Sequence, residues 1–333
     1  MRLVVCLAMV AMITGGAVSL RQQAVPVLTV RVGGTALELS AGGGSLWVLV
    51  CDSGCAGEAR ESMGRIVRVD PRTGHIVASA TLVRPNDIAV AASGVYATDF
   101  WRDTIRRLDP TTLREVSALK LRLPFRFTAH DNAFLPLVVA ATPRAVWVAT
   151  DRCALAHANQ HASRVIATVR LPCAAFGGMS AADNVVWLSE SLLGVYRVDP
   201  VTNRVVARIH LGPRERRLNA DRVLLGDGKV LVSGEWTSGG APTDGSGLAR
   251  IDPKRNRLET VTPLPSGALA LTYGDHSLWL ARMGGPTVKR IDPHTGKTIA
   301  TFHGHVGVAL AVANGQLWTL SRNGTLRQLG KSS

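Results

Sequence analysis

Charged side chains recur a few residues after each of a series of mostly aromatic positions, and together they could bind a polar ligand. The aromatic series consists of Trp47, Tyr96, Trp147, Trp187, Leu231, Trp279 and Trp318, which are 39 to 51 residues apart. Three to five residues later the chain has Asp52, Asp99, Asp151, Glu190, Glu235, Arg282 and Arg322, and Trp101 and Trp236 lie beside this series. Acids facing arginines could hold a zwitterionic, glycan or cationic group. The alternative is that they are solvated loop ends or cap strand termini.

These residues need a repeated scaffold to bring them together, and the sequence contains one. Asp-Pro turns recur as VDPRTG (69–74), LDPTTL (108–113), VDPVTN (198–203), IDPKRN (251–256) and IDPHTG (291–296). Their aspartates are separated by 39, 90, 53 and 40 residues, and Asn159 marks a degenerate copy inside the long gap. Proline fixes φ, aspartate accepts from backbone amides, and Gly or Asn tolerates positive φ. The repeat predicts four short strands per unit, for example 267–273, 277–281, 287–291 and 298–302.

Units of ~40–45 residues with four strands each predict an all-β fold, namely a β-propeller with seven blades. The last unit offers only three strands (308–312, 316–320 and 325–329), and residues 26–32 can supply the fourth and close the ring. We expect one domain over residues 26–330. Six or eight blades, and a two-domain chain with a linker at 123–136, are the alternatives. In such blades the second strands end at the rim opposite the Asp-Pro turns, where the charged series would form a crescent.

The units resemble the bacterial YVTN-type and streptogramin-lyase-like seven-bladed propellers. The matching segments are LWLARMGGPTVKRIDPHTGKTIATF (278–302) and VWLSESLLGVYRVDPVTNRVVARIHLG (186–212). The resemblance implies a site at the rim where the second strands end. The lyases carry histidines, a glutamate and a magnesium ion there, which would make His130 and Glu190 an acid–base pair in an enzyme. Arg282 and Arg322 depart from that pattern.

We therefore expect a binding or scaffold module without catalysis. Its partner would be a polar small molecule, a glycan or a protein at the channel rim. A lyase-like or lactonase-like enzyme and an extracytoplasmic sensor are the alternatives. No cofactor and no metal site are expected, because the chain has no Gly-rich phosphate loop and no metal-ligand spacing. We expect a monomer.

The amino terminus predicts export. Residues 1–19 combine Arg2, an apolar run over 3–13 and small residues before a cleavage site, as in a signal peptide; a membrane anchor is the alternative. We therefore expect an extracellular, periplasmic or cell-envelope location. Four cysteines follow, and we prefer the disulfides Cys51–Cys55 and Cys153–Cys173 to a metal site, since their spacing does not match zinc knuckles.

The net charge is +14, and 32 of the 38 basic residues are arginine. Most of this excess is attributed to compositional bias. Arg214, Arg216, Arg217 and Arg222 form one local cluster, a candidate basic patch for an anionic component of the cell envelope. A nucleic-acid partner is disfavoured by the export signal and by the scarcity of interleaved aromatic residues.

Overall fold

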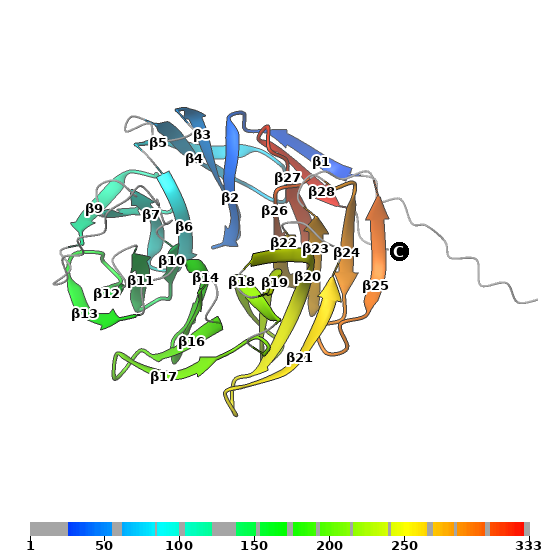
Figure 1. Ribbon diagram of the computed structural model, residues 1–333. Helices are drawn as coiled ribbons and strands as arrows, with labels where there is room; N and C mark the ends of the chain where they lie inside the picture. The colour runs from blue at the N-terminus through cyan, green and yellow to red at the C-terminus, as the bar shows by residue number, and fades with distance from the viewer. Residues whose placement is uncertain are drawn as a thin grey trace, which may run out of the picture.

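The chain forms seven four-stranded antiparallel sheets arranged as a ring (Figure 1). The computed structural model describes residues 26–54, 62–83, 85–99, 104–121, 138–150, 154–171, 176–190, 194–213, 216–238, 241–264, 269–282, 285–303 and 307–329. Within this part of the chain every regular element is a strand, and none is a helix long and apolar enough to cross a membrane. The predicted all-β, seven-bladed propeller is confirmed.

Each blade is numbered in chain order, and its strands run from the ring centre outward. Blade 1 has β2 (Thr35–Gly42), β3 (Ser45–Ser53), β4 (Met63–Val69) and β5 (Ile76–Val83). Blade 2 has β6 (Pro85–Ala91), β7 (Gly94–Asp99), β8 (Thr104–Leu108) and β9 (Glu115–Lys120). Blade 3 has β10 (Val138–Ala141), β11 (Ala145–Thr150), β12 (Ala154–Asn159) and β13 (Val165–Arg170). Blade 4 has β14 (Phe176–Ala182), β15 (Val185–Glu190), β16 (Gly194–Asp199) and β17 (Arg204–Ile209).

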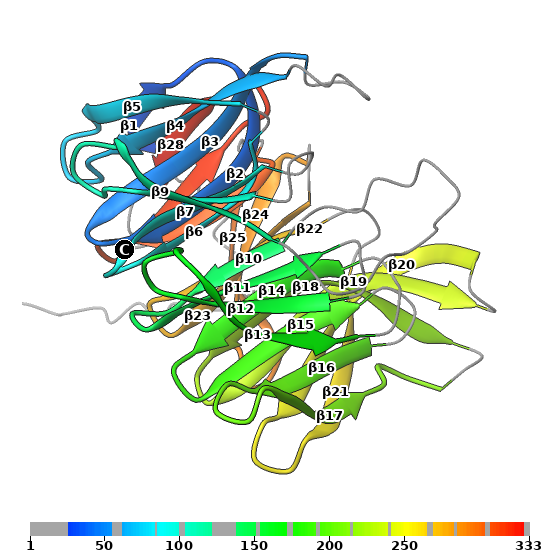
Figure 2. The ribbon, with the colours of Figure 1, turned by 90° about the vertical axis from the view of Figure 1, so that its left-hand side faces the viewer.

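Blade 5 has β18 (Arg217–Gly226), β19 (Lys229–Ser238), β20 (Ala241–Asp252) and β21 (Arg257–Leu264). Blade 6 has β22 (Leu269–Gly274), β23 (Ser277–Arg282), β24 (Thr287–Ile291) and β25 (Thr298–His303). Blade 7 has β26 (Ala309–Ala313), β27 (Gln316–Leu320), β28 (Thr325–Leu329) and β1 (Pro26–Arg31). Blade 5 has the longest strands, and β20 reaches beyond the neighbouring blades in the side view (Figure 2).

The two ends of the described chain meet in blade 7. Strand β1 pairs antiparallel with β28, so that Arg31 lies opposite Thr325 and Val30 opposite Leu326. The first and last strands therefore lie side by side in the ring (Figure 1). This is the closure predicted from residues 26–32, and it joins blade 7 to blade 1 without an open ring edge.

The hydrophobic core lies between the blades. Seven clusters of buried apolar side chains are present in the described residues, and each takes members from two adjacent blades. Trp187, for example, packs from blade 4 against Leu218 and Val232 of blade 5. Both faces of a blade are thereby covered, which a single blade could not achieve, and stability depends on the whole ring.

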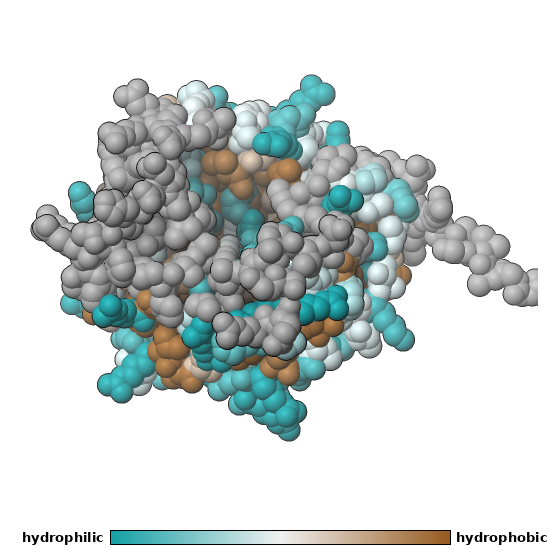
Figure 3. Space-filling model, in the orientation of Figure 1, coloured by the Kyte–Doolittle hydropathy of each residue, from teal (hydrophilic) through white to brown (hydrophobic). Residues whose placement is uncertain are grey.

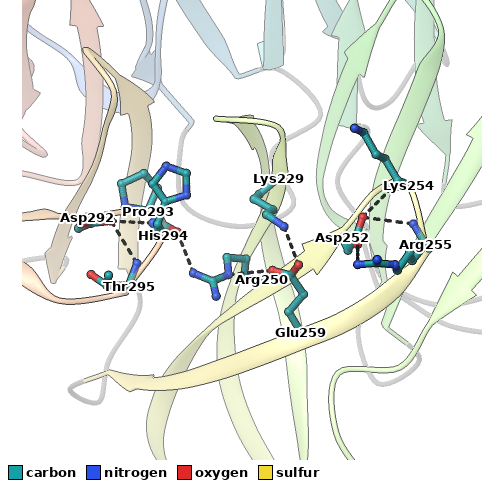
Figure 4. Close-up of polar contacts among 10 residues, drawn as sticks. All are labelled: Lys229, Arg250, Asp252, Lys254, Arg255, Glu259, Asp292, Pro293, His294 and Thr295. Carbon is teal, nitrogen blue, oxygen red and sulfur yellow. Dashed lines mark hydrogen bonds and ion pairs between the residues drawn. The ribbon is translucent and has the colours of Figure 1, made fainter.

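The Asp-Pro turns share one edge of the ring, which we call the Asp-Pro rim. In each turn the side chain of the aspartate accepts hydrogen bonds from the residues two and three positions later; Asp292, for example, accepts from the amides of His294 (2.7 Å) and Thr295 (3.1 Å) (Figure 4). These backbone bonds hold the pKa of Asp292 below its usual range. Asn159 accepts from the amide of Ser163, four residues later, and its own amide donates to the carbonyl oxygen of Arg164, as the amide of Asp292 donates to that of Lys297; the turn at Asn159 is therefore a variant of the same turn. Positive φ falls at the expected last position, for example at Asn203 (55°) and Gly296 (71°).

Arginines on the third strands of blades 1, 4 and 5 connect each of these blades to the following one. Arg68, Arg197 and Arg250 donate to the carbonyl oxygens of Pro110, Pro253 and Pro293, which belong to the Asp-Pro turns of the following blades. Figure 4 shows the contact of Arg250, which also donates to Glu259 of its own blade at 3.0 Å. On the second strands, these arginines pair with members of the mostly aromatic series, for example Arg197 with Trp187. The guanidinium carbon of Arg197 is 5.8 Å from the ring centre of Trp187. Part of the arginine excess that we attributed to compositional bias therefore has a structural role.

Candidate functional site

The innermost strands of all seven blades enclose a central cavity of about 610 Å³. In the view of Figure 3, the hollow contains hydrophilic residues beside hydrophobic ones. Three charged residues line this cavity among the described residues: Glu38 of β2, Asp87 of β6 and Arg222 of β18. The uncharged polar side chains in its wall are Ser40, Asn86, Ser180, Thr272 and Tyr273. The cavity thus receives its charges from blades 1, 2 and 5.

An ion pair crosses from blade 5 to blade 1 inside the ring. Arg222 Nη1 lies 3.2 Å from Glu38 Oε2, although the two residues are 184 positions apart in the sequence. Asp87 is held in the wall by two backbone amides: Oδ1 accepts from Ile88 (2.8 Å) and Oδ2 accepts from Val139 of blade 3 (2.8 Å). Asp87 is therefore fixed by its own and the adjacent blade, whereas Glu38 is held by an arginine from across the ring.

Irregular pairing of the innermost strands brings these side chains into the cavity. The register shifts between Ala36 and Glu38 in β2, between Pro85 and Ile88 in β6, and between Ala220 and Arg222 in β18. A β-bulge breaks the alternation of side chains and redirects the residue beside it. Ala220 and Val223 both pack in the core between blades 4 and 5, whereas regular alternation would place residue 222, and not residue 223, on the same face as Ala220. The bulges are the local cause of the site.

Blade 4 supports the irregular segment of β18. A Cβ atom on Gly177 or Gly178 would collide with the backbone of residues 221–223, so only glycine permits the close approach of β14 to β18. The hydroxyl of Ser189, which is fully buried, lies 3.1 Å from the carbonyl oxygen of Asp221 and accepts the amide of Gly178 at 2.7 Å. The backbone of Arg222 is therefore supported from the neighbouring blade.

The cavity contains one side chain that stays positively charged, Arg222, and one acid whose pKa is shifted upward, Asp87. Burial, together with the charge of Glu38, raises the pKa of Asp87 to about 7. Burial likewise raises the pKa of Asp221, which lies next to Arg222 in the chain. The charge of Glu38 raises the pKa of Arg222, so this guanidinium stays protonated. Among the described residues, no group of three or more His, Cys, Asp or Glu side chains is placed to hold a metal ion.

The predicted crescent is placed at the expected strand ends, but its members differ in exposure. Asp99, Glu190 and Arg282 are the last residues of β7, β15 and β23, Glu235 lies in β19, and Arg322 follows β27. Asp99 and Glu190 are fully buried, whereas Glu235, Arg282 and Arg322 are exposed. Trp101 and Asp151 lie outside the described residues. A ligand shared by this series stays a prediction.

The buried acids at the strand ends have partners inside their own blades. Glu190 accepts a hydrogen bond from the Tyr196 hydroxyl at 3.1 Å, and burial raises its pKa to about 7. Asp99 lies 3.7 Å from the guanidinium of Arg106. In blade 1, Asp52 is bound by Arg65 through two contacts of 2.8 and 2.9 Å. His130, the suggested acid–base partner of Glu190, lies outside the described residues.

The arginines of the predicted basic patch do not share one surface in the structure. Arg216 is exposed, and its guanidinium carbon lies 4.7 Å from the ring centre of Trp236, whose indole nitrogen donates to the carbonyl oxygen of Ser246. Arg217 begins β18 and is partly buried, whereas Arg222 lines the central cavity. Arg214 lies outside the described residues.

The remaining sequence predictions fall largely on residues that the structure does not describe. Cys51 is buried in β3, whereas Cys55, Cys153 and Cys173 lie outside the described residues, so both disulfide pairings stay predictions. The same holds for the signal peptide at residues 1–19.

Glu38 and Asp87 were absent from the predicted site. Their signal in the sequence is an acid within an apolar first strand, in the segments TALELSAG (35–42) and PNDIAVA (85–91). Both segments otherwise have the composition of half-buried strands, where an acidic residue normally needs a partner.

Comparison with known proteins gives a fold and no family. The sequence matches no known protein family and no curated protein. The structure is similar to the crystal structure of BamB from Moraxella catarrhalis, with a TM-score of 0.60 and 12% identity, covering 92% of this chain and 100% of that chain. The shared feature is the β-propeller. At this identity the similarity shows the fold alone, and the finer resemblance to YVTN-type or streptogramin-lyase-like propellers stays a prediction.

Proposed function

We propose that this protein is a β-propeller binding module that takes a small polar ligand into its central cavity. The observation that supports this function is the convergence of Glu38, Asp87 and Arg222 from three blades on a cavity of about 610 Å³. Ligand pockets of proteins typically enclose ~300–1,000 Å³ and present a few placed polar groups. The accessible surface of this cavity is mostly polar, with apolar residues such as Leu37, Leu271 and Leu310 between the polar groups, which suits a small polar ligand.

The proposal moves the predicted site from the rim into the ring. Asp99 and Glu190 make contacts within blades 2 and 4, which a ligand at the rim would have to replace. The cavity charges instead belong to three blades and lie on bulged segments. Export is part of the proposed function and is supported by the leader-like residues 1–19. Protein partners would then meet the outer faces of the ring, as expected for a scaffold.

A thermal-shift screen tests the proposed function. The probes are free amino acids, simple amines, short carboxylates and monosaccharides, applied to the wild-type protein and to Glu38→Gln and Asp87→Asn. Exposed residues supply matched controls, Asp183→Asn and Arg204→Met. We expect at least one probe class to raise the Tm of the wild type and the controls, and to raise it less in the cavity variants, because binding to the folded state stabilises it.

Two results would overturn the proposed function. One is the absence of any stabilising probe, and the other is a stabilisation that the cavity variants retain in full. Loss of the response in Arg282→Ala, together with retention in Asp87→Asn, would place the ligand at the rim instead.

A further inference from the structure

Arg222 presents a guanidinium to the cavity from the middle of an inner strand. Its side chain retains 43% of its accessible surface, although its neighbours Ala220 and Val223 are buried. One of its nitrogens is engaged by Glu38 at 3.2 Å. Guanidinium carries five N–H donors in a planar fork that matches the two oxygens of a carboxylate. The remaining accessible face of Arg222 is therefore suited to a ligand carboxylate.

Asp87 presents the opposite charge from blade 2. Each of its oxygens already accepts one backbone amide at 2.8 Å, which fixes the orientation of the carboxylate, and each oxygen can accept a further hydrogen bond. Arg222 and Asp87 are close enough for the charge of Asp87 to act on the arginine. The cavity thus offers a fixed acceptor and a fixed donor group on inner strands of different blades.

We propose, building on the proposed function, that the ligand of the central cavity is a zwitterionic amino carboxylate. Its carboxylate pairs with Arg222 and its ammonium with Asp87, with Glu38 orienting the arginine. A ligand with both charges satisfies both walls of the cavity at once. A simple cation would pair with Asp87 but leave the accessible face of Arg222 without a partner, and a simple anion would pair with Arg222 against the charges of Glu38 and Asp87.

Other ligand classes fit the wall less well. Tyr273 is the one aromatic residue among the described residues that line the cavity, so there is no aromatic cage for a quaternary ammonium group. A neutral sugar would desolvate Asp87 and the Arg222–Glu38 ion pair without supplying a charge in return, at a cost in free energy. The hydroxyls of Ser40, Ser180 and Thr272 are available in the wall for further polar groups of the ligand.

Titration calorimetry with matched probes tests this assignment. The probes are L-alanine and glycine as zwitterions, ethylamine as the amine alone, propionate as the carboxylate alone and glucose as the neutral compound. We expect the wild type and the controls Asp183→Asn and Arg204→Met to bind the zwitterions at least tenfold more tightly than either singly charged probe. Asp87→Asn should lose the preference over propionate, and Arg222→Met should lose the preference over ethylamine.

A second arginine variant covers the case in which Arg222→Met fails to fold. Arg222→Lys keeps the positive charge but loses the planar fork, and we expect it to bind the zwitterions about tenfold more weakly than the wild type. Equal affinity of Arg222→Lys and wild type would contradict the carboxylate assignment.

The outcomes separate this inference from the proposed function. Cavity-dependent binding of propionate, ethylamine or glucose at least as tightly as the zwitterions overturns the inference and leaves the binding function standing. Zwitterion binding that survives in Asp87→Asn and Arg222→Lys overturns both, as does the absence of binding by every probe.

Discussion

The Asp-Pro rim and the central cavity are built from the same repeated strands but follow opposite rules. At the rim, five turns have an aspartate at the same position, which accepts a hydrogen bond from the amide two residues later, and in all five the last residue has positive φ. In the cavity, blade 1 supplies Glu38, blade 2 supplies Asp87 and blade 5 supplies Arg222, whereas the wall residues of blade 7 are apolar. The rim repeats, and the cavity does not.

This difference separates residues that hold the ring together from residues available for a ligand. Arg197 and Arg250 contact the turn of the next blade, and each has a counterpart elsewhere in the ring. Arg222 has no counterpart of the same kind among the described residues that line the cavity, and its partner Glu38 lies across the ring. Within a repeat protein, a charge that breaks the repeat in a concave position is therefore the better guide to function than a charge that recurs.

Removing a repeated core residue should have the largest effect on stability. Trp187 is fully buried between blades 4 and 5, so Trp187→Ala is expected to lower the free energy of unfolding by about 3–5 kcal/mol. Urea denaturation followed by circular dichroism measures the loss. Trp187→Phe is the control, since it retains part of the packing and should cost less. An unchanged midpoint for Trp187→Ala would show that the inter-blade cores do not carry the stability of the ring.

Glu190 should make stability depend on pH in the opposite sense to the rim aspartates. Burial raises its folded pKa from 4.5 to about 7, so between these values the native state binds more protons than the unfolded state and stability falls as pH rises. Glu190→Gln should remove this loss and stabilise the protein at pH 8 by about 2–3 kcal/mol. Urea midpoints at pH 5 and pH 8 measure it. Parallel pH profiles of the variant and the wild type would contradict the buried, uncharged state of Glu190.

Cutting one contact between neighbouring blades should have a moderate effect and leave the cavity unaffected. Arg197 donates to the carbonyl oxygen of Pro253 (2.9 Å) and to Asn256 Oδ1 (2.7 Å). Arg197→Met is expected to cost about 1–3 kcal/mol in the free energy of unfolding, because charged hydrogen bonds to the next blade are lost. Arg204→Met, at an exposed position, should cost less than 0.5 kcal/mol or so. A change in ligand affinity in Arg197→Met would contradict the separation between rim and cavity.

The sequence predicted the repeated part of the molecule well because repetition averages out local ambiguity. The closure strand at 26–32, the degenerate turn at Asn159 and the strand of Trp279 were all located from spacing alone. Each has several counterparts along the chain, and the turn chemistry of Asp-Pro leaves little choice of conformation. The same periodicity placed Asp99, Glu190 and Arg282 at the ends of their strands.

The cavity residues could not be predicted in the same way. Periodic reasoning assigns one direction to each side chain, and a β-bulge reverses that direction after the bulge. Arg222 was grouped with Arg214, Arg216 and Arg217 in one basic patch because the four are close in the sequence, whereas the bulge after Ala220 accompanies its position in the cavity. The spacing of the repeats also could not predict that Asp99 and Glu190 are buried, since burial depends on how adjacent blades pack.

The pH dependence of ligand binding should be the smallest effect and the most specific to the cavity. Asp87 faces Glu38 from β2, Arg222 from β18 and the amide of Val139 from β10, and its pKa is about 7. A ligand ammonium favours ionised Asp87, so glycine or L-alanine should bind about tenfold more tightly at pH 8 than at pH 6 and release a proton on binding at the lower pH. Calorimetry in buffers of different ionisation enthalpy measures that proton. In Asp87→Asn the affinity should be weak and independent of pH, whereas Asp183→Asn should behave as the wild type. Proton uptake on binding, or a wild-type affinity that falls from pH 6 to pH 8, would place the ammonium elsewhere than on Asp87.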